Sequence, residues 1–138
     1  MAKKKSRDHK KKSHSEQSSA QLNIILQKTS ELYQKGEIKD ALLLTEQSLT
    51  QFPNHPLLLG NAGIFSICTG NEKTAIKYFK KSLKVNPNNP DTHNNLGNVF
   101  KDTGQFNQAE ISYKNALDLK PDYVNALYNL GSLFLLKN

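Results

Sequence analysis

The sequence has a single cysteine, no tryptophan and no long apolar run. One cysteine excludes an intramolecular disulfide and a cysteine-rich zinc site. Cys68 stands in an apolar helical stretch, which predicts a small buried or half-buried side chain. No apolar run approaches the roughly 20 residues that cross a bilayer, and no apolar segment follows the basic N-terminus as in a secretory signal. We therefore expect a cytoplasmic protein.

Motifs that carry catalysis are also missing. The sequence has no phosphate-binding glycine-rich loop, no H-E-x-x-H and no cysteine paired with a histidine at a neighbouring helical position. The spacing of His9 and His14 does not make a metal site, and His55 and His93 fall at a turn and at a packing position. We therefore expect no enzyme activity, no cofactor and no metal ion.

The N-terminal segment 1–20 is distinct from the rest of the chain. It includes seven Lys or Arg and two acidic residues, and so accounts for most of the formal net charge of +7. With almost no apolar side chain, this segment is predicted to be a disordered polybasic tail over residues 1–20. Residues 3–12 could make weak contacts with nucleic acid or an anionic membrane. The absence of aromatic residues that stack on bases favours a merely solvated tail.

The remaining segment, 21–138, repeats one pattern with a constant period of about 34 residues. Its landmarks are Gly36, Gly70 and Gly104, then Ala41, Ala75 and Ala109, then Pro53, Pro87 and Pro121. Between them, apolar residues recur at helical spacing, so each unit reads as a helix, a glycine break, a second helix and a proline stop. A fixed period of this length is typical of a solenoid whose units bury their apolar faces against one another. The pattern predicts an all-α fold built of helix pairs.

The third unit carries the most specific motif, formed by Leu96, Gly97, Phe100, Gly104, Ala109, Tyr113, Ala116 and Pro121. These residues resemble the L-G-x-x-Y, G, A, F/Y, A and P positions of the tetratricopeptide repeat (TPR). The resemblance covers repeats at about 22–55, 56–89 and 90–123 and a partial repeat at 124–138. It implies an alpha-alpha superhelix of antiparallel helix pairs, whose first helices line a concave groove.

The resemblance also implies which residues face that groove. Gln27, Asn61, Asn95 and Asn129 stand one repeat period apart and resemble the asparagine ladder that holds peptide in O-linked N-acetylglucosamine transferases and related bacterial TPR proteins. An amide can pair with both the N–H and the C=O of an extended backbone. The implied peptide-binding groove comprises Gln27, Asn61, Asn95, Asn98, Asn129, Leu57, Ile64 and Tyr128. The open alternative is that the amides pack between helices or face solvent.

Two functions remain in view at this point. The first is a protein-protein interaction scaffold that binds an extended peptide or a partner protein. The alternative is the N-terminal substrate-recruiting arm of a glycosyltransferase- or sulfotransferase-type enzyme whose catalytic part is absent here. A carboxylate clamp for chaperone tails, with its Lys, Asn, Asn, Lys and Arg, is not expected. The counterparts of those five positions are Leu26, Ser30, Asn61, Asp91 and Asn95, of which one matches.

The last segment, 124–138, reads as a first helix without a second helix to cover it. Leu133, Phe134 and Leu136 lie in this segment and are predicted to form an assembly surface. The occupant of that surface stays open at this stage. It is a second copy of the chain, another protein, or the continuation of a longer array.

Overall fold

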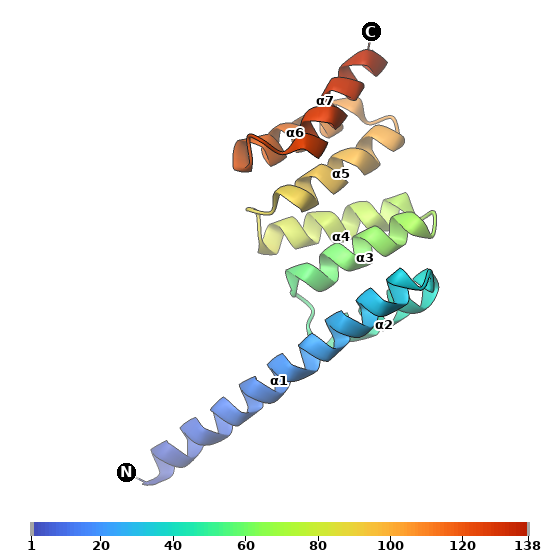
Figure 1. Ribbon diagram of the computed structural model, residues 1–138. Helices are drawn as coiled ribbons and strands as arrows, with labels where there is room; N and C mark the ends of the chain where they lie inside the picture. The colour runs from blue at the N-terminus through green and yellow to red at the C-terminus, as the bar shows by residue number, and fades with distance from the viewer. Residues whose placement is uncertain (1, 138) are drawn as a thin grey trace.

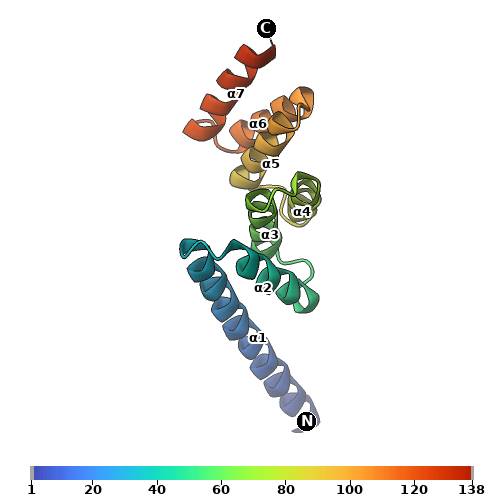
Figure 2. The same cartoon turned by 90° about the vertical axis from the view of Figure 1, so that its right-hand side faces the viewer.

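The computed structural model describes residues 2–137, with side chains described from Ser15 onward. These residues form seven helices: α1 (Ala2–Gln34), α2 (Ile38–Gln51), α3 (Pro56–Cys68), α4 (Glu72–Val85), α5 (Pro90–Asp102), α6 (Phe106–Leu119) and α7 (Val124–Lys137). Each helix packs on the next, and the closest pairs are α3 with α4 and α5 with α6. Figures 1 and 2 show the pairs stacked in chain order, with the two termini at opposite ends. The prediction of an all-α superhelix of antiparallel pairs is confirmed.

Glycine makes the turn inside each complete pair. Gly36, Gly70 and Gly104 have φ of 78°, 75° and 75°, in the left-handed region that a side chain disfavours. Asparagine caps two of the helices: the Asn71 side chain accepts a backbone N–H of α4 at 3.3 Å, and the Asn89 side chain accepts one of α5 at 3.1 Å. The glycines recur at a constant spacing because each pair makes its turn with the same left-handed backbone conformation.

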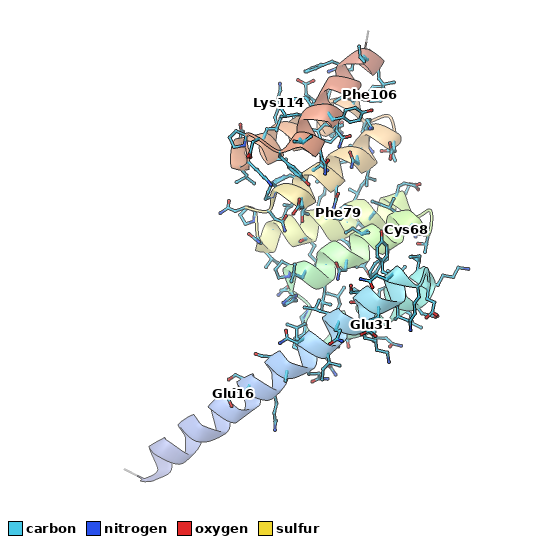
Figure 3. All side chains as sticks on the ribbon, in the orientation of Figure 1. Glu16, Glu31, Cys68, Phe79, Phe106 and Lys114 are labelled. Carbon is cyan, nitrogen blue, oxygen red and sulfur yellow. The ribbon has the colours of Figure 1, made fainter. Side chains whose placement is uncertain are left out.

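A glycine and an aromatic ring join the two helices of a pair. A Cβ placed on Gly63 would lie 2.5 Å from the ring of Phe79, and one placed on Gly97 would lie 2.6 Å from the ring of Tyr113. Both rings are fully buried, and Figure 3 labels Phe79 inside the stack of helices. The absence of a side chain on each glycine is therefore what lets the ring sit directly on the helix backbone.

The predicted disordered tail differs from the structure, because α1 runs as one helix from Ala2. Its first half extends past α2, and Glu16 lies on this exposed part (Figure 3). In the half of α1 that packs on α2, the Gln21 side chain donates to Gln51 at 3.1 Å. Lys, Arg, Ala, Glu and Gln are good helix formers. Since the packed half nucleates the helix, each further residue adds a hydrogen bond at low cost.

For two side chains the structure contradicts the predicted burial or exposure. Leu133, predicted in the assembly surface, is fully buried in the core cluster with Tyr113 and Val99. Cys68, predicted to be buried or half-buried, is exposed at the end of α3. Leu133 lies seven residues after the buried Ala126 and therefore on the same face of α7. Cys68 is the last residue of α3 and lies beside the turn at Gly36.

Candidate peptide-binding groove

A hollow of about 570 Å³ lies between α5 and α7. Its lining is formed by Asn94, Asn95, Asn98, Tyr123, Val124, Asn125, Tyr128 and Asn129. Four of the predicted groove residues, Asn95, Asn98, Tyr128 and Asn129, therefore meet in one place. Amide groups dominate the lining, so the hollow offers hydrogen-bond donors and acceptors without a formal charge.

Side-chain hydrogen bonds hold part of this lining in position. Asn129 on α7 donates its Nδ2 to Oδ1 of the buried Asn94 on α5, at 3.1 Å. The Tyr113 hydroxyl donates to Oδ1 of Asn98 at 2.7 Å, and burial raises the pKa of that hydroxyl, so it keeps its proton at neutral pH. Asn98 and Asn129 therefore have one atom each committed to the protein, and each retains further hydrogen-bonding capacity toward the hollow.

Tyr123 lines the hollow beside the start of α7. Its hydroxyl donates to Oδ1 of Asp91 at 2.5 Å. Burial, together with the hydrogen bond and the negative charge of Asp91, raises the pKa of Tyr123 to about 12. The phenol is therefore a neutral donor at physiological pH, and its acceptor is the Asp91 carboxylate. None of the residues that line the hollow carries a formal charge.

The four amides predicted to form a ladder are not equivalent. Gln27 on α1 donates to Glu31 of the same helix at 3.0 Å, and Asn129 is paired with Asn94. Among the described residues, neither Asn61 nor Asn95 uses its side chain in a hydrogen bond within the chain. Both side chains are half-buried. Two neighbouring first helices, α3 and α5, thus present amides whose hydrogen bonds are left to water or a ligand.

The remaining predicted groove residues lie outside the hollow. Leu57 is at the start of α3 and is 54% exposed. Ile64 is half-buried and packs against the core cluster, so it contributes more to the stack than to a binding surface. Tyr128, by contrast, is 76% exposed at the rim of the hollow. A large ring exposed to that degree beside amides offers an apolar contact to a bound chain.

Tyr123 is one of the residues of this site that the sequence reasoning missed. It occupies the repeat position of His55 and Asn89, whose side chains cap α3 and α5. A tyrosine cannot cap a helix in this way, and Tyr123 instead lines the hollow. The break in the period at that position is the signal that would have found it.

The described part of the chain shows neither a metal site nor a membrane-spanning helix. No group of three or more His, Cys, Asp or Glu side chains among these residues could hold a metal ion. Within the same residues, none of the helices combines the length and the apolar character needed to span a bilayer.

Three family models match the chain. One described as TPR repeat covers residues 97–138, and two described as tetratricopeptide repeat cover residues 78–111 and 59–89. Together they span the chain continuously from residue 59 to residue 138. No curated protein matches the sequence.

Several solved structures share the fold. The first TPR of Spaghetti (RPAP3), bound to the HSP90 peptide SRMEEVD, is 15% identical with a TM-score of 0.80, over 83% of this chain and 90% of that one. The Yersinia enterocolitica secretion chaperone SycD, in complex with a peptide of the translocator YopD, is 15% identical with a TM-score of 0.78, over 85% and 95%. The Thermobaculum terrenum O-GlcNAc transferase is 25% identical with a TM-score of 0.79, over 84% of this chain but only 22% of the transferase.

Proposed function

Because the chain is a tetratricopeptide repeat protein, we propose that it is a protein-protein interaction module that binds an extended peptide of a partner protein along α3, α5 and α7. The observation that carries this proposal is the amide-lined hollow between α5 and α7, beside the uncommitted amides of Asn61 and Asn95. Peptides of partner proteins are bound by the TPR domains of RPAP3 and by SycD.

The chemistry of the lining favours recognition of the peptide backbone. Asn95 can donate through its NH₂ group and accept through its oxygen, so it can pair with the C=O and the N–H of one residue of an extended chain. Asn61 can do the same one repeat earlier, and Asn98 and Asn129 add their remaining donors and acceptors. Each bond contributes only about 1 kcal/mol. We therefore propose that sequence preference comes from apolar contacts, with Tyr128 at the rim.

The same lining does not suit an acidic peptide tail. A bound carboxylate is normally held by Lys or Arg, which form charge-assisted hydrogen bonds. No Lys or Arg lines the hollow. The carboxylate of Asp91 accepts a hydrogen bond from Tyr123, which is one of the lining residues. We therefore expect this groove to prefer uncharged segments over a peptide such as SRMEEVD.

The proposal is tested by titrating the ¹⁵N-labelled chain with a mixture of uncharged decapeptides, acetylated and amidated at their ends, and separately with SRMEEVD. We expect the side-chain NH₂ signals of Asn61, Asn95 and Asn98 to shift with the uncharged mixture and to change little with SRMEEVD. Asn95→Ala should weaken binding of the mixture about thirtyfold, which is the loss of two hydrogen bonds of about 1 kcal/mol each.

Asn115→Ala is the matched control, because Asn115 is an exposed amide on α6 outside the hollow. It should bind the mixture like the parent chain. Equal losses in Asn95→Ala and Asn115→Ala would reject the groove as the binding site. Tighter binding of SRMEEVD than of the uncharged mixture would reject backbone recognition in favour of carboxylate recognition.

A second function is supported by the likeness to the Thermobaculum terrenum O-GlcNAc transferase, of which this chain covers 22%. A substrate-recruiting arm would use the same groove for the segment to be modified. Adding the catalytic part of a glycosyltransferase in trans would then raise modification of a peptide that the groove binds. Unchanged modification in the presence of the chain would argue against this role.

A further inference from the structure

Helix α4 carries a row of lysines along one face. The row consists of five residues, namely Lys73, Lys77, Lys80, Lys81 and Lys84. At about 100° per residue, all five fall within an arc of about 100°, and they extend over about 16 Å of the helix. We call this face the lysine stripe. All five side chains are exposed, so the stripe presents five positive charges to its surroundings.

The lysine stripe lies opposite the face by which α4 packs. Ala75, Phe79 and Ser82 are the buried residues of α4, and their centre is about 180° from the centre of the stripe around the helix axis. The buried face packs on α3 and α5, the helices that carry Asn61 and Asn95. The stripe therefore faces away from the peptide groove, and both surfaces can be occupied at once.

No carboxylate among the described residues forms an ion pair with the lysine stripe. Both ion pairs in this part of the chain are made by Glu110 on α6. Glu46 on α2 accepts from Tyr78 at 2.9 Å, and Tyr78 lies outside the arc of the stripe. Lys80 has its ammonium 5.7 Å from the centre of the Phe100 ring. The positive charge of the stripe is therefore not balanced within the described stack.

The repeat does not require these lysines. One period later, on α6, the equivalent positions hold Asn107, Ile111, Lys114, Asn115 and Asp118, with no net charge. One period earlier, on α2, they hold Lys39, Leu43, Glu46, Gln47 and Thr50, again with no net charge. Lysines three or four positions apart repel one another and destabilise a helix. The stripe is therefore specific to α4, and its repulsion is relieved by an anion that the described residues do not supply.

The composition and shape of the stripe favour a lipid surface over nucleic acid. Arg7 is the only arginine of the sequence, whereas nucleic-acid recognition commonly uses the planar guanidinium of arginine. A lysine ammonium acts as a point charge on a flexible stem, which suits the dispersed phosphates of lipid headgroups. The stripe also has no aromatic residue to stack on a base. An arc of about 100° along a straight helix meets a flat surface with all five charges.

We propose that the lysine stripe docks the stack onto an anionic phospholipid surface, with its ammonium groups on the headgroup phosphates. Each lysine near such a surface raises the binding constant about fivefold, so five raise it on the order of a thousandfold. The contact is electrostatic, because no stripe residue is apolar. Phe134 and Leu136 of the predicted assembly surface are exposed on α7 rather than on α4. The groove on α3, α5 and α7 stays open to a peptide.

The probe is a suspension of vesicles made of equal parts phosphatidylglycerol and phosphatidylcholine, with vesicles of phosphatidylcholine alone as the reference. The full chain is mixed with each kind, and the bound fraction is measured by co-sedimentation. We expect binding to the anionic vesicles that weakens at least tenfold between about 50 and 300 mM salt, and none to the reference. Absence of binding, equal binding to both kinds, or binding that salt does not change would overturn the proposal.

Two double substitutions with the same change in charge locate the contact. Lys77→Gln with Lys84→Gln removes two charges of the stripe and should weaken binding to the anionic vesicles about thirtyfold. Lys28→Gln with Lys35→Gln, at exposed positions of the first helix pair, should bind like the parent. Equal losses in the two double variants would show that net charge alone governs binding, against the proposal.

The N-terminal segment and duplex DNA are the rival site and the rival ligand. Lys4→Gln with Lys11→Gln should weaken vesicle binding less than the stripe variant does, and the reverse order would assign the attraction to the N-terminal segment. A duplex DNA oligonucleotide should bind the chain more weakly per phosphate than the vesicles do, and tighter binding would assign the stripe to nucleic acid. Either of these contrary results would overturn the proposal.

A last pair of measurements separates the stripe from the groove. Asn95→Ala should bind the anionic vesicles like the parent, and Lys77→Gln with Lys84→Gln should bind the uncharged peptide mixture like the parent. Loss of vesicle binding in Asn95→Ala would place the lipid contact in the groove and overturn the proposal.

Discussion

Two glycines at equivalent positions should respond in opposite directions to the same substitution. Gly97 on α5 and Gly131 on α7 stand one repeat period apart in the shared N-L-G-x-x-F motif. A Cβ at position 97 would lie 2.6 and 2.7 Å from two ring carbons of Tyr113, whereas a Cβ at position 131 meets nothing within 4 Å. The pair Gly97→Ala and Gly131→Ala therefore isolates the effect of helix packing from that of the helix itself.

The expected magnitudes follow from two opposing effects. Replacing a mid-helix glycine by alanine stabilises a helix by about 0.5–1 kcal/mol, and Gly131→Ala should show this gain alone. At position 97 the same gain is opposed by overpacking, which costs about 1–3 kcal/mol. The ring of Tyr113 is fully buried and its hydroxyl is held by Asn98 at 2.7 Å, so it cannot move aside without losing about 1 kcal/mol of hydrogen bonding. Gly131→Ala should thus be more stable than Gly97→Ala by about 1–3 kcal/mol.

The difference can be measured by urea unfolding of the two variants and the parent chain, followed by far-ultraviolet circular dichroism. The midpoint should rise for Gly131→Ala and fall or stay level for Gly97→Ala, with the slope unchanged. Gly63→Ala is a second test of the clash, because its Cβ would lie 2.5 Å from the ring of Phe79. If Gly97→Ala proved as stable as Gly131→Ala, the close approach of ring and helix would not be a determinant of this fold.

Two further predictions concern acid stability and the turns. The hydrogen bond from Lys114 and then that from Lys137 lower the pKa of Glu110 from its ordinary 4.5 to about 2. The ionised Glu110 therefore stabilises the fold fully above pH 4.5, and this stabilisation is lost as the pH falls toward 2. The urea midpoints of the parent and Glu110→Gln should therefore converge over that range, and a constant difference would contradict the ion pairs. Gly104→Ala should destabilise by about 1–2 kcal/mol in thermal unfolding, because φ is 75° there. Gly60→Ala, in open space within α3, should be neutral or stabilising, and equal effects of the two would refute the role of φ.

The repeat period contained more information than its helical pattern alone. One period before Leu133 stands Val99, and one period after Cys68 stands Asp102. Val99 is 1% exposed and Asp102 is exposed, so the period by itself would have placed Leu133 in the core and Cys68 at the surface. Both predictions were wrong because hydrophobicity was weighed without the register. The helical tail is a different case, since composition there cannot distinguish a solvated helix from a disordered chain.

The sequence by itself determined the helix pairs and their turns, and four of the predicted groove residues, Asn95, Asn98, Tyr128 and Asn129, line the hollow. Spacing sets which face of a helix a residue occupies, and Gly36, Gly70 and Gly104 set where the chain reverses. The tertiary structure alone decided which of the amide side chains form hydrogen bonds within the chain and which do not. The pairing of Asn129 with Asn94 at 3.1 Å and the open space above Gly131 depend on how closely neighbouring helices approach. That distance is set by the packing of side chains far apart in the sequence, because a local pattern cannot specify it.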